Sequence, residues 1–159
     1  MSAKRRRYRQ PSITKDHYQE QLKRITFFLE RSLGGKAILE ALRNADLQVE
    51  PHSKWFRHNT PDQDWLPIVG EKKWIVLMRD KAIGKRYLEL NALLRSKVKA
   101  FVLVTGELSE QVSAEIIKKA VPKIVEMIEQ NDSHLSRRFI RIAQWNCGEL
   151  KCSLSKGFN

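Results

Sequence analysis

Cysteine is scarce in this chain of 159 residues, which holds Cys147 and Cys152 and no others. Its four histidines lie scattered at positions 17, 52, 58 and 134, without the close ligand spacing of a structural zinc site. The composition therefore argues against a zinc module and a disulfide scaffold. We expect reduced thiols of minor structural importance, with a redox pair as the less favoured alternative.

Long apolar runs are also missing, since none approaches the roughly 20 residues that cross a bilayer. The N-terminal end is basic but has no apolar stretch behind it, unlike a secretory signal. Hydrophobic residues still make up 42% of the chain, enough for the core of one domain with tails. We predict a soluble, cytoplasmic protein without a membrane partner.

Acidic residues are few, with 18 against 30 lysines and arginines, and the formal net charge is +12. The excess gathers at the ends. Residues 1–24 carry eight basic residues against two acids, and residues 134–159 carry five against one. Basic ends on a nearly neutral domain favour phosphate-rich partners, and we assign Arg5, Arg6 and Arg7 to nucleic-acid binding. The alternative is a disordered, solubilising tail.

Short apolar runs alternate with amphipathic stretches along the chain. Residues 74–78 are apolar and flanked by charged residues, as in a strand buried on both faces of a parallel sheet. Further strands are predicted at 25–29, 47–50, 98–104 and 138–143, the 47–50 and 138–143 strands at sheet edges. Helices are predicted at 14–23, 36–44, 87–94 and 109–130, and another begins at 60–66, cut short by Pro67 and ended by Gly70.

This alternation predicts an α/β fold, a three-layer α/β/α domain around a central, mostly parallel sheet. The domain is expected over residues 24–143. A basic extension, residues 1–23, precedes it, and a loose polar tail, residues 144–159, follows. Residues 51–60 are expected to be a loop whose aromatic side chains pack on the domain, with stacking on bases as the alternative.

Carboxylates follow two of the predicted strands. Glu30 ends the 25–29 run and Asp80 closely follows the 74–78 run. Ligands of open α/β sheets bind beyond the carboxyl ends of the strands, so these acids are placed for chemistry. Asp62 and Asp64 open the predicted helix at 60 and would add oxygen ligands for Mg²⁺ or Mn²⁺. Taken alone, either aspartate is as readily a helix cap or dipole partner.

Basic residues lie near the same predicted sheet edge. Arg31, Arg79, Lys81 and Arg86 are candidates to hold phosphates of a nucleic acid. The alternatives are ion pairs with the nearby acids and plain exposure to solvent. The pair Gly34-Gly35 is a weak phosphate-loop signal, because the spacing of a Walker motif is absent.

Three stretches together resemble the PIN-like domains related to VapC toxins, over roughly residues 24–143. They are Phe27–Gly35, Thr60–Gly70 and Trp74–Lys81. The resemblance implies a metal-dependent ribonuclease, often the toxin of a toxin–antitoxin pair that a small antitoxin inhibits, and dimers are common in the family. It assigns Glu30, Asp62, Asp64 and Asp80 to the catalytic metal site.

One position departs from that family pattern, because its first carboxylate is usually Asp and is Glu30 here. The extra methylene moves the carboxylate by about one bond, which a rigid octahedral Mg²⁺ site absorbs poorly. The leading hypothesis is an endoribonuclease using Mg²⁺ or Mn²⁺. The alternatives are a catalytically weakened RNA-binding or ribosome-associated module and, third, a nuclease acting on DNA.

Overall fold

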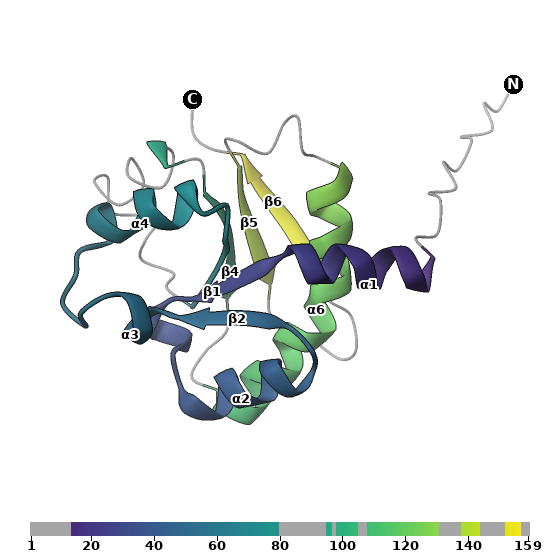
Figure 1. Ribbon diagram of the computed structural model, residues 1–159, viewed down its shortest axis with the longest axis horizontal. Coiled ribbons are helices and arrows are strands. Elements are labelled where there is room, and N and C mark those ends of the chain that lie inside the picture. The colour runs from purple at the N-terminus through teal and green to yellow at the C-terminus, as the bar shows by residue number, and fades with distance from the viewer. Residues whose placement is uncertain are drawn as a thin grey trace, which may run out of the picture.

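A single twisted sheet organises the computed structural model, which describes residues 14–79, 95–96, 98–104, 108–130, 138–143 and 152–156 (Figure 1). Six strands among these residues lie in the order β2-β1-β3-β4-β5-β6. They are β1 (Thr26–Leu29), β2 (Gln48–Pro51), β3 (Ile75–Met78), β4 (Lys99–Val104), β5 (Arg138–Ala143) and β6 (Cys152–Lys156). Neighbours from β2 to β5 run parallel, and β6 runs antiparallel to β5.

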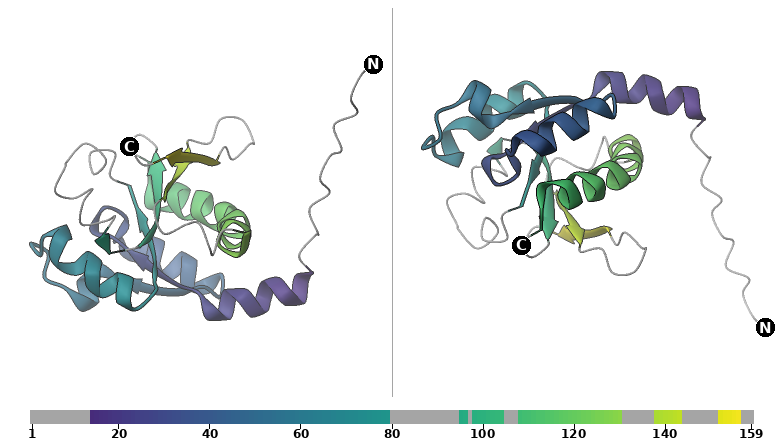
Figure 2. Two further views of the ribbon diagram at one scale, coloured as in Figure 1. Left: turned by 90° about the horizontal axis from the view of Figure 1, so that it is seen from above. Right: turned by 90° about the horizontal axis from the view of Figure 1, so that it is seen from below.

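Helices cover both faces of the sheet (Figure 2). On one face lie α1 (Lys15–Arg24), α2 (Lys36–Asn44) and α6 (Glu110–Gln130). On the other lie α3 (His52–Trp55) and α4 (Asp62–Glu71). The predicted three-layer α/β/α fold with a mostly parallel sheet is therefore confirmed.

Strand β1 shows why both faces are apolar. Phe27 and Leu29 point into the core shared with α2 and α6, and Phe28 points into the core shared with α4. Successive side chains of a strand alternate between faces, so a continuous apolar run is what a doubly covered strand requires. β1 pairs with β2 on one side and β3 on the other, which fixes it at the centre of the site described below.

Helix α1 belongs to the packed domain. Thr14 caps it by accepting a hydrogen bond from the backbone N–H of His17 at 3.4 Å. Leu22 is buried in the core that α6 also lines. Part of the basic extension predicted for residues 1–23 thus contributes apolar contacts. No helix among the described residues is long and apolar enough to cross a bilayer.

Three sequence-based predictions need correction. Residues 52–55 form the short helix α3 where a loop was expected. Helix α4 continues through Pro67 and Gly70 to Glu71, because burial of its apolar face outweighs the backbone hydrogen bond that proline removes. Strand β5 is not an edge strand, since β6 pairs with it from the segment expected to be a loose tail. The predicted helix at 87–94 lies outside the described residues.

Candidate functional site

The site lies at the carboxyl edge of the parallel sheet, where β1 and β3 end side by side. The register pairs Leu29 with Leu77, and the backbone N–H of Glu30 donates to the carbonyl of Leu77 at 3.0 Å. Glu30 therefore leaves the sheet at the position where open α/β folds bind ligands. Helix α4 begins near the same edge and brings Asp62 to it.

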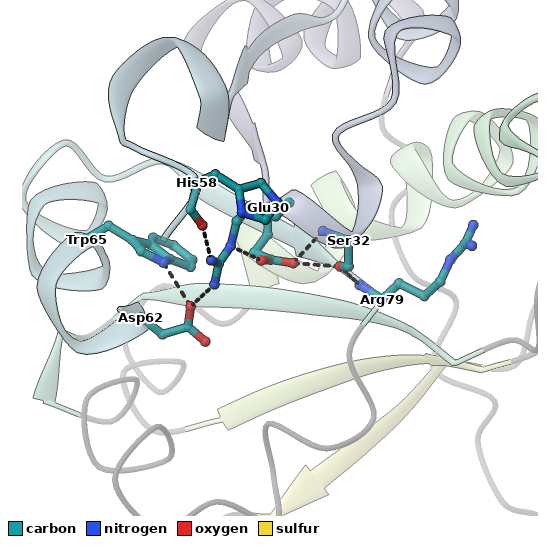
Figure 3. A network of polar contacts seen from close by, with 7 residues as sticks. Glu30, Ser32, His58, Asp62, Trp65 and Arg79 are labelled. Carbon is teal, nitrogen blue, oxygen red and sulfur yellow. Dashed lines mark hydrogen bonds and ion pairs between the residues drawn. The ribbon is translucent and has the colours of Figure 1, made fainter. Parts of the chain in front are cut away.

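Glu30 is buried, with 7% of its surface exposed, and caps a short 3₁₀ helix at Arg31–Leu33. Its Oε2 accepts hydrogen bonds from the backbone N–H of Ser32 at 2.9 Å and from the Ser32 hydroxyl at 2.6 Å. The same hydroxyl accepts a hydrogen bond from the backbone N–H of Arg79 at 2.8 Å (Figure 3). Ser32 thus ties the carboxylate to the end of β3.

Arg31 links the two described carboxylates. Its Nε lies 3.4 Å from Glu30 Oε1, and Nη2 lies 3.3 Å from Asp62 Oδ1. Its Nη1 donates to the backbone carbonyl of His58. The guanidinium is held between an acid at the end of β1 and an acid at the start of α4. One positive charge balances part of two negative ones in a place with restricted access to water.

Asp62 is the first residue of α4, and its side chain is 10% exposed. Its Oδ1 also accepts a hydrogen bond from the Trp65 indole at 2.9 Å, and its negative charge suits the helix N-terminus. Pro61 occupies the cap position, for which Asp62 was one expected candidate. Asp64 is exposed, because residues two apart on a helix face different directions.

The predicted acids are therefore brought together in part. Glu30 and Asp62 share Arg31, and Asp64 points away from this network. The guanidinium of Arg79, expected to hold phosphate, donates to the hydroxyl of buried Ser113 on α6. The remaining predicted site residues lie outside the described part of the chain: Asp80, Lys81, Arg86, Arg5, Arg6 and Arg7.

Glu30 and Asp62 are suitable ligands for a hard divalent cation, because both are carboxylates and they come from different elements. Within the described residues, no three His, Cys, Asp or Glu side chains gather closely enough to hold an ion. Arg31 fills the space between Glu30 and Asp62, so a shared cation requires this guanidinium to turn away.

A cavity of about 510 Å³ has Arg31 in its wall, and this arginine links it to the two carboxylates. Helix α3 and the segment after it supply most of the lining, which comprises Arg31, Gly34, His52, Ser53, Lys54, Trp55, Phe56, Arg57 and His58. Residues 51–60 were expected to be a loop with its aromatic side chains packed on the domain or stacked on bases, and this cavity was not predicted. The available signal was the interleaving of aromatic and basic residues.

His52 is 1% exposed and packs among the rings of Phe28, Phe56 and Trp65. Neither ring nitrogen has a hydrogen-bond partner among the described residues. Burial, followed by the charge of Arg31, lowers the pKa of His52, although the charges of Glu30 and Asp62 oppose this. The ring is therefore held neutral, with donor and acceptor capacity unused.

The chain is an α/β domain that carries Glu30 and Asp62 at the carboxyl edge of its parallel sheet. Residues 25–105, just over half of the chain, match the family described as PIN like domain. The chain belongs to this family, which is associated with nucleases and typically binds metals. No curated protein and no solved structure gave a match.

Proposed function

We propose that this chain is a metal-dependent endoribonuclease. The observation that carries the proposal is the convergence of Glu30 and Asp62 on Arg31 at the carboxyl edge of the parallel sheet. Two acids from different elements, partly shielded from water, require a compensating positive charge, which Arg31 supplies here and a metal ion would supply once Arg31 turns to the substrate. Membership in the PIN-like domain family supports the same reading.

In this proposal Glu30, Asp62 and Asp80 would hold Mg²⁺ or Mn²⁺. Asp64, which forms an acidic pair with Asp62 at the start of α4, would be a further ligand. A bound ion supplies an activated water and neutralises charge developing on the scissile phosphate. Arg31 turns from the two carboxylates toward the phosphate backbone, where a guanidinium forms paired hydrogen bonds. Lys81, Arg86, Arg79 and the basic residues Arg5, Arg6 and Arg7 add affinity for the RNA backbone.

We further propose, from the resemblance to VapC-related domains, a cytoplasmic toxin of a type II toxin–antitoxin pair. Its partners would be a small antitoxin and a second copy of the chain. Co-expression with the gene next to its own tests this part. Growth arrest by the chain alone, relieved by a small neighbouring protein that co-purifies with it, is the expected result.

Cleavage of a mixed single-stranded RNA pool with Mn²⁺, with Mg²⁺ and with EDTA tests the nuclease. Asp62→Asn and Asp80→Asn should each lower the rate by about 100-fold or more, since each removes a metal ligand. Asp16→Asn is the matched control, because Asp16 also lies in the first turn of a helix but on α1. Cleavage that persists in EDTA or in both site variants would refute the proposal.

A second candidate is an RNA-binding module with weakened chemistry. It is favoured by the engagement of both Glu30 oxygens, one by Arg31 and one by Ser32. Glu30→Asp and Glu30→Ala separate the two candidates. Higher activity in Glu30→Asp indicates a weakened natural site, and loss of cleavage in Glu30→Ala supports the enzyme. Single-stranded DNA in parallel identifies the preferred nucleic acid.

A further inference from the structure

The cavity beside Arg31 combines positive charge with aromatic surface. Arg31, Lys54 and Arg57 line it, and none of its described lining residues is acidic. Its volume of about 510 Å³ lies in the range of roughly 300–1,000 Å³ usual for small-molecule sites. A cationic, partly aromatic cavity suits a ligand with both a phosphate and a flat ring.

Trp55 supplies the flat surface. It is 41% exposed, yet its indole donates to Glu50 Oε2 at 2.9 Å, and Lys54 donates to the same oxygen at 2.8 Å. The ring also stands edge-on to Trp74, with centroids 5.1 Å apart. These contacts hold an exposed indole in one orientation, which lowers the entropic cost of stacking a base on it.

Arg57 supplies an exposed positive charge. Its side chain is exposed and has no ion-pair partner among the described residues, in contrast to Lys54, which pairs with Glu50. Arg31, which donates to the backbone carbonyl of His58 next to Arg57, belongs to both the cavity and the carboxylate pair. A phosphate held between Arg57 and Arg31 therefore lies next to the candidate cleavage site.

His52 supplies unused hydrogen-bonding groups. It lines the cavity, is 1% exposed, and leaves both ring nitrogens without partners among the described residues. Burying such groups without hydrogen bonds destabilises a protein, so a bound ligand that satisfies them recovers that loss. A nucleobase, with donors and acceptors at its edge, meets this need once the His52 ring, whose nitrogens are buried in the free protein, turns toward the cavity.

We propose that this cavity binds one nucleotide of a single-stranded RNA, with its base on Trp55, its edge read by His52 and its phosphate on Arg57 and Arg31. The inference rests on the proposed function, and it assigns this cavity to a nucleotide adjacent to the bond that is cleaved. It gives the enzyme a way to choose its cleavage position through a neighbouring base.

The test is isothermal titration calorimetry of the full chain in EDTA, where metal-dependent cleavage cannot proceed. The probes are adenosine 5′-monophosphate, ribose 5-phosphate, inorganic phosphate and the trinucleotide ApApA at one ionic strength. The expected order has the nucleotide binding about tenfold more tightly than ribose 5-phosphate, because the base stacks. ApApA binds at least as tightly as the mononucleotide.

Variants assign the contacts. Trp55→Leu should weaken mononucleotide and ApApA binding about tenfold and leave ribose 5-phosphate unchanged. Arg57→Gln, at an exposed position that does not endanger folding, should weaken all phosphate-bearing probes. Arg24→Gln removes one positive charge from α1, where Arg24 pairs with Glu20. This control should change neither nucleotide binding nor the binding of the other phosphate-bearing probes. Thermal unfolding of Trp55→Leu confirms that the variant is folded.

Equal binding of the mononucleotide and ribose 5-phosphate, or an affinity that Arg57→Gln leaves intact, would overturn the proposal. Mononucleotide binding without ApApA binding would overturn its RNA part, and point to a free nucleotide. Because these measurements need no metal, they stand apart from the cleavage test. RNA cleavage without nucleotide binding refutes this inference alone, and nucleotide binding without cleavage refutes the nuclease alone.

Discussion

Arg31 is the residue on which both proposals meet, since it contacts the two carboxylates and lines the cavity. Its guanidinium competes with any cation that Glu30 and Asp62 share. Arg31→Gln should therefore tighten Mn²⁺ binding by about threefold to tenfold while weakening RNA binding. Mn²⁺ titration followed by electron paramagnetic resonance measures the first effect, and RNA filter binding in EDTA measures the second.

Arg24→Gln is the control for the Arg31 variant, because it lowers the net charge equally from an exposed ion pair on α1. Weaker Mn²⁺ binding in Arg31→Gln than in Arg24→Gln would show that Arg31 supports the ion rather than competes with it.

His52 makes stability depend on pH. Its pKa is lowered in the folded state, first by burial and then by Arg31. Above about pH 6.5 the ring is neutral in both the folded and the unfolded state, so its protonation does not lower the free energy of unfolding. As the pH falls below that value, His52 is protonated in the unfolded state but stays neutral in the folded state. The free energy of unfolding therefore decreases.

His52→Phe should remove this part of the acid sensitivity, which is at most about 1.4 kcal/mol per pH unit. It should also raise stability at pH 7 by roughly 1 kcal/mol, because two unsatisfied nitrogens leave the aromatic cluster. Urea unfolding between pH 5 and pH 8 checks both. Identical pH slopes in the variant and the natural chain would contradict the assignment.

At the residue scale, the sequence predicted where a residue lies in the fold better than which side chains it contacts. Glu30 was placed correctly at the end of a strand, since an apolar run followed by a carboxylate is visible without the fold. For Arg31, an ion pair with the nearby acids stayed one of several open alternatives, because its contact with Asp62 spans 31 positions and depends on where α4 packs. The orphaned nitrogens of His52 likewise arise from the tertiary packing of α3, β1 and α4.

At the scale of elements, α4 shows how packing overrides local signals. A Cβ added at Gly70 would lie 2.3 Å from the carbonyl oxygen of Ser96, a backbone atom with little freedom to move. Gly70→Ala improves helix propensity, yet it should lower the free energy of unfolding by about 1–3 kcal/mol through overpacking. Urea unfolding at pH 7 measures the change.

Gly35→Ala is the comparison for that prediction. Its added Cβ would meet the carboxylate of Glu110 at 2.2 Å, the far end of a flexible side chain that caps α2 through the N–H of Ala37. That carboxylate can turn away, so the cost should be smaller than at Gly70. A larger loss in Gly35→Ala would show that the Glu110 contact fastens α6 to α2.

The elements themselves were predictable where apolar residues repeat. Helix α2 was predicted with its observed bounds, and α6 was expected to begin after Ser109, which caps it. Helix α3 was missed because His-Ser-Lys-Trp has no apolar periodicity. Strand β6 was missed because its residues are largely polar, and its place is defined by pairing with β5.

At the scale of the whole molecule, the charge distribution predicts salt-dependent RNA binding. Replacing Arg5, Arg6 and Arg7 together by Gln should lower the slope of log affinity against log salt concentration by about 2, at roughly 0.7 per phosphate contact on single strands. Filter binding at several salt concentrations, in EDTA, provides the slope. An unchanged slope would assign these arginines a role apart from RNA.

The family match and the folding unit do not coincide. Residues 25–105 contain every candidate metal ligand, but the apolar face formed by Phe27, Leu77 and Phe101 is covered by α6, which begins at Glu110. In a fragment trimmed to the matched residues, the face of the sheet with Phe27, Leu77 and Phe101 would keep α2 but lose the cover of α1 and α6, and the hydrophobic surface exposed there would promote aggregation. A fragment designed to fold on its own should therefore include α6 and extend at least to Gln130.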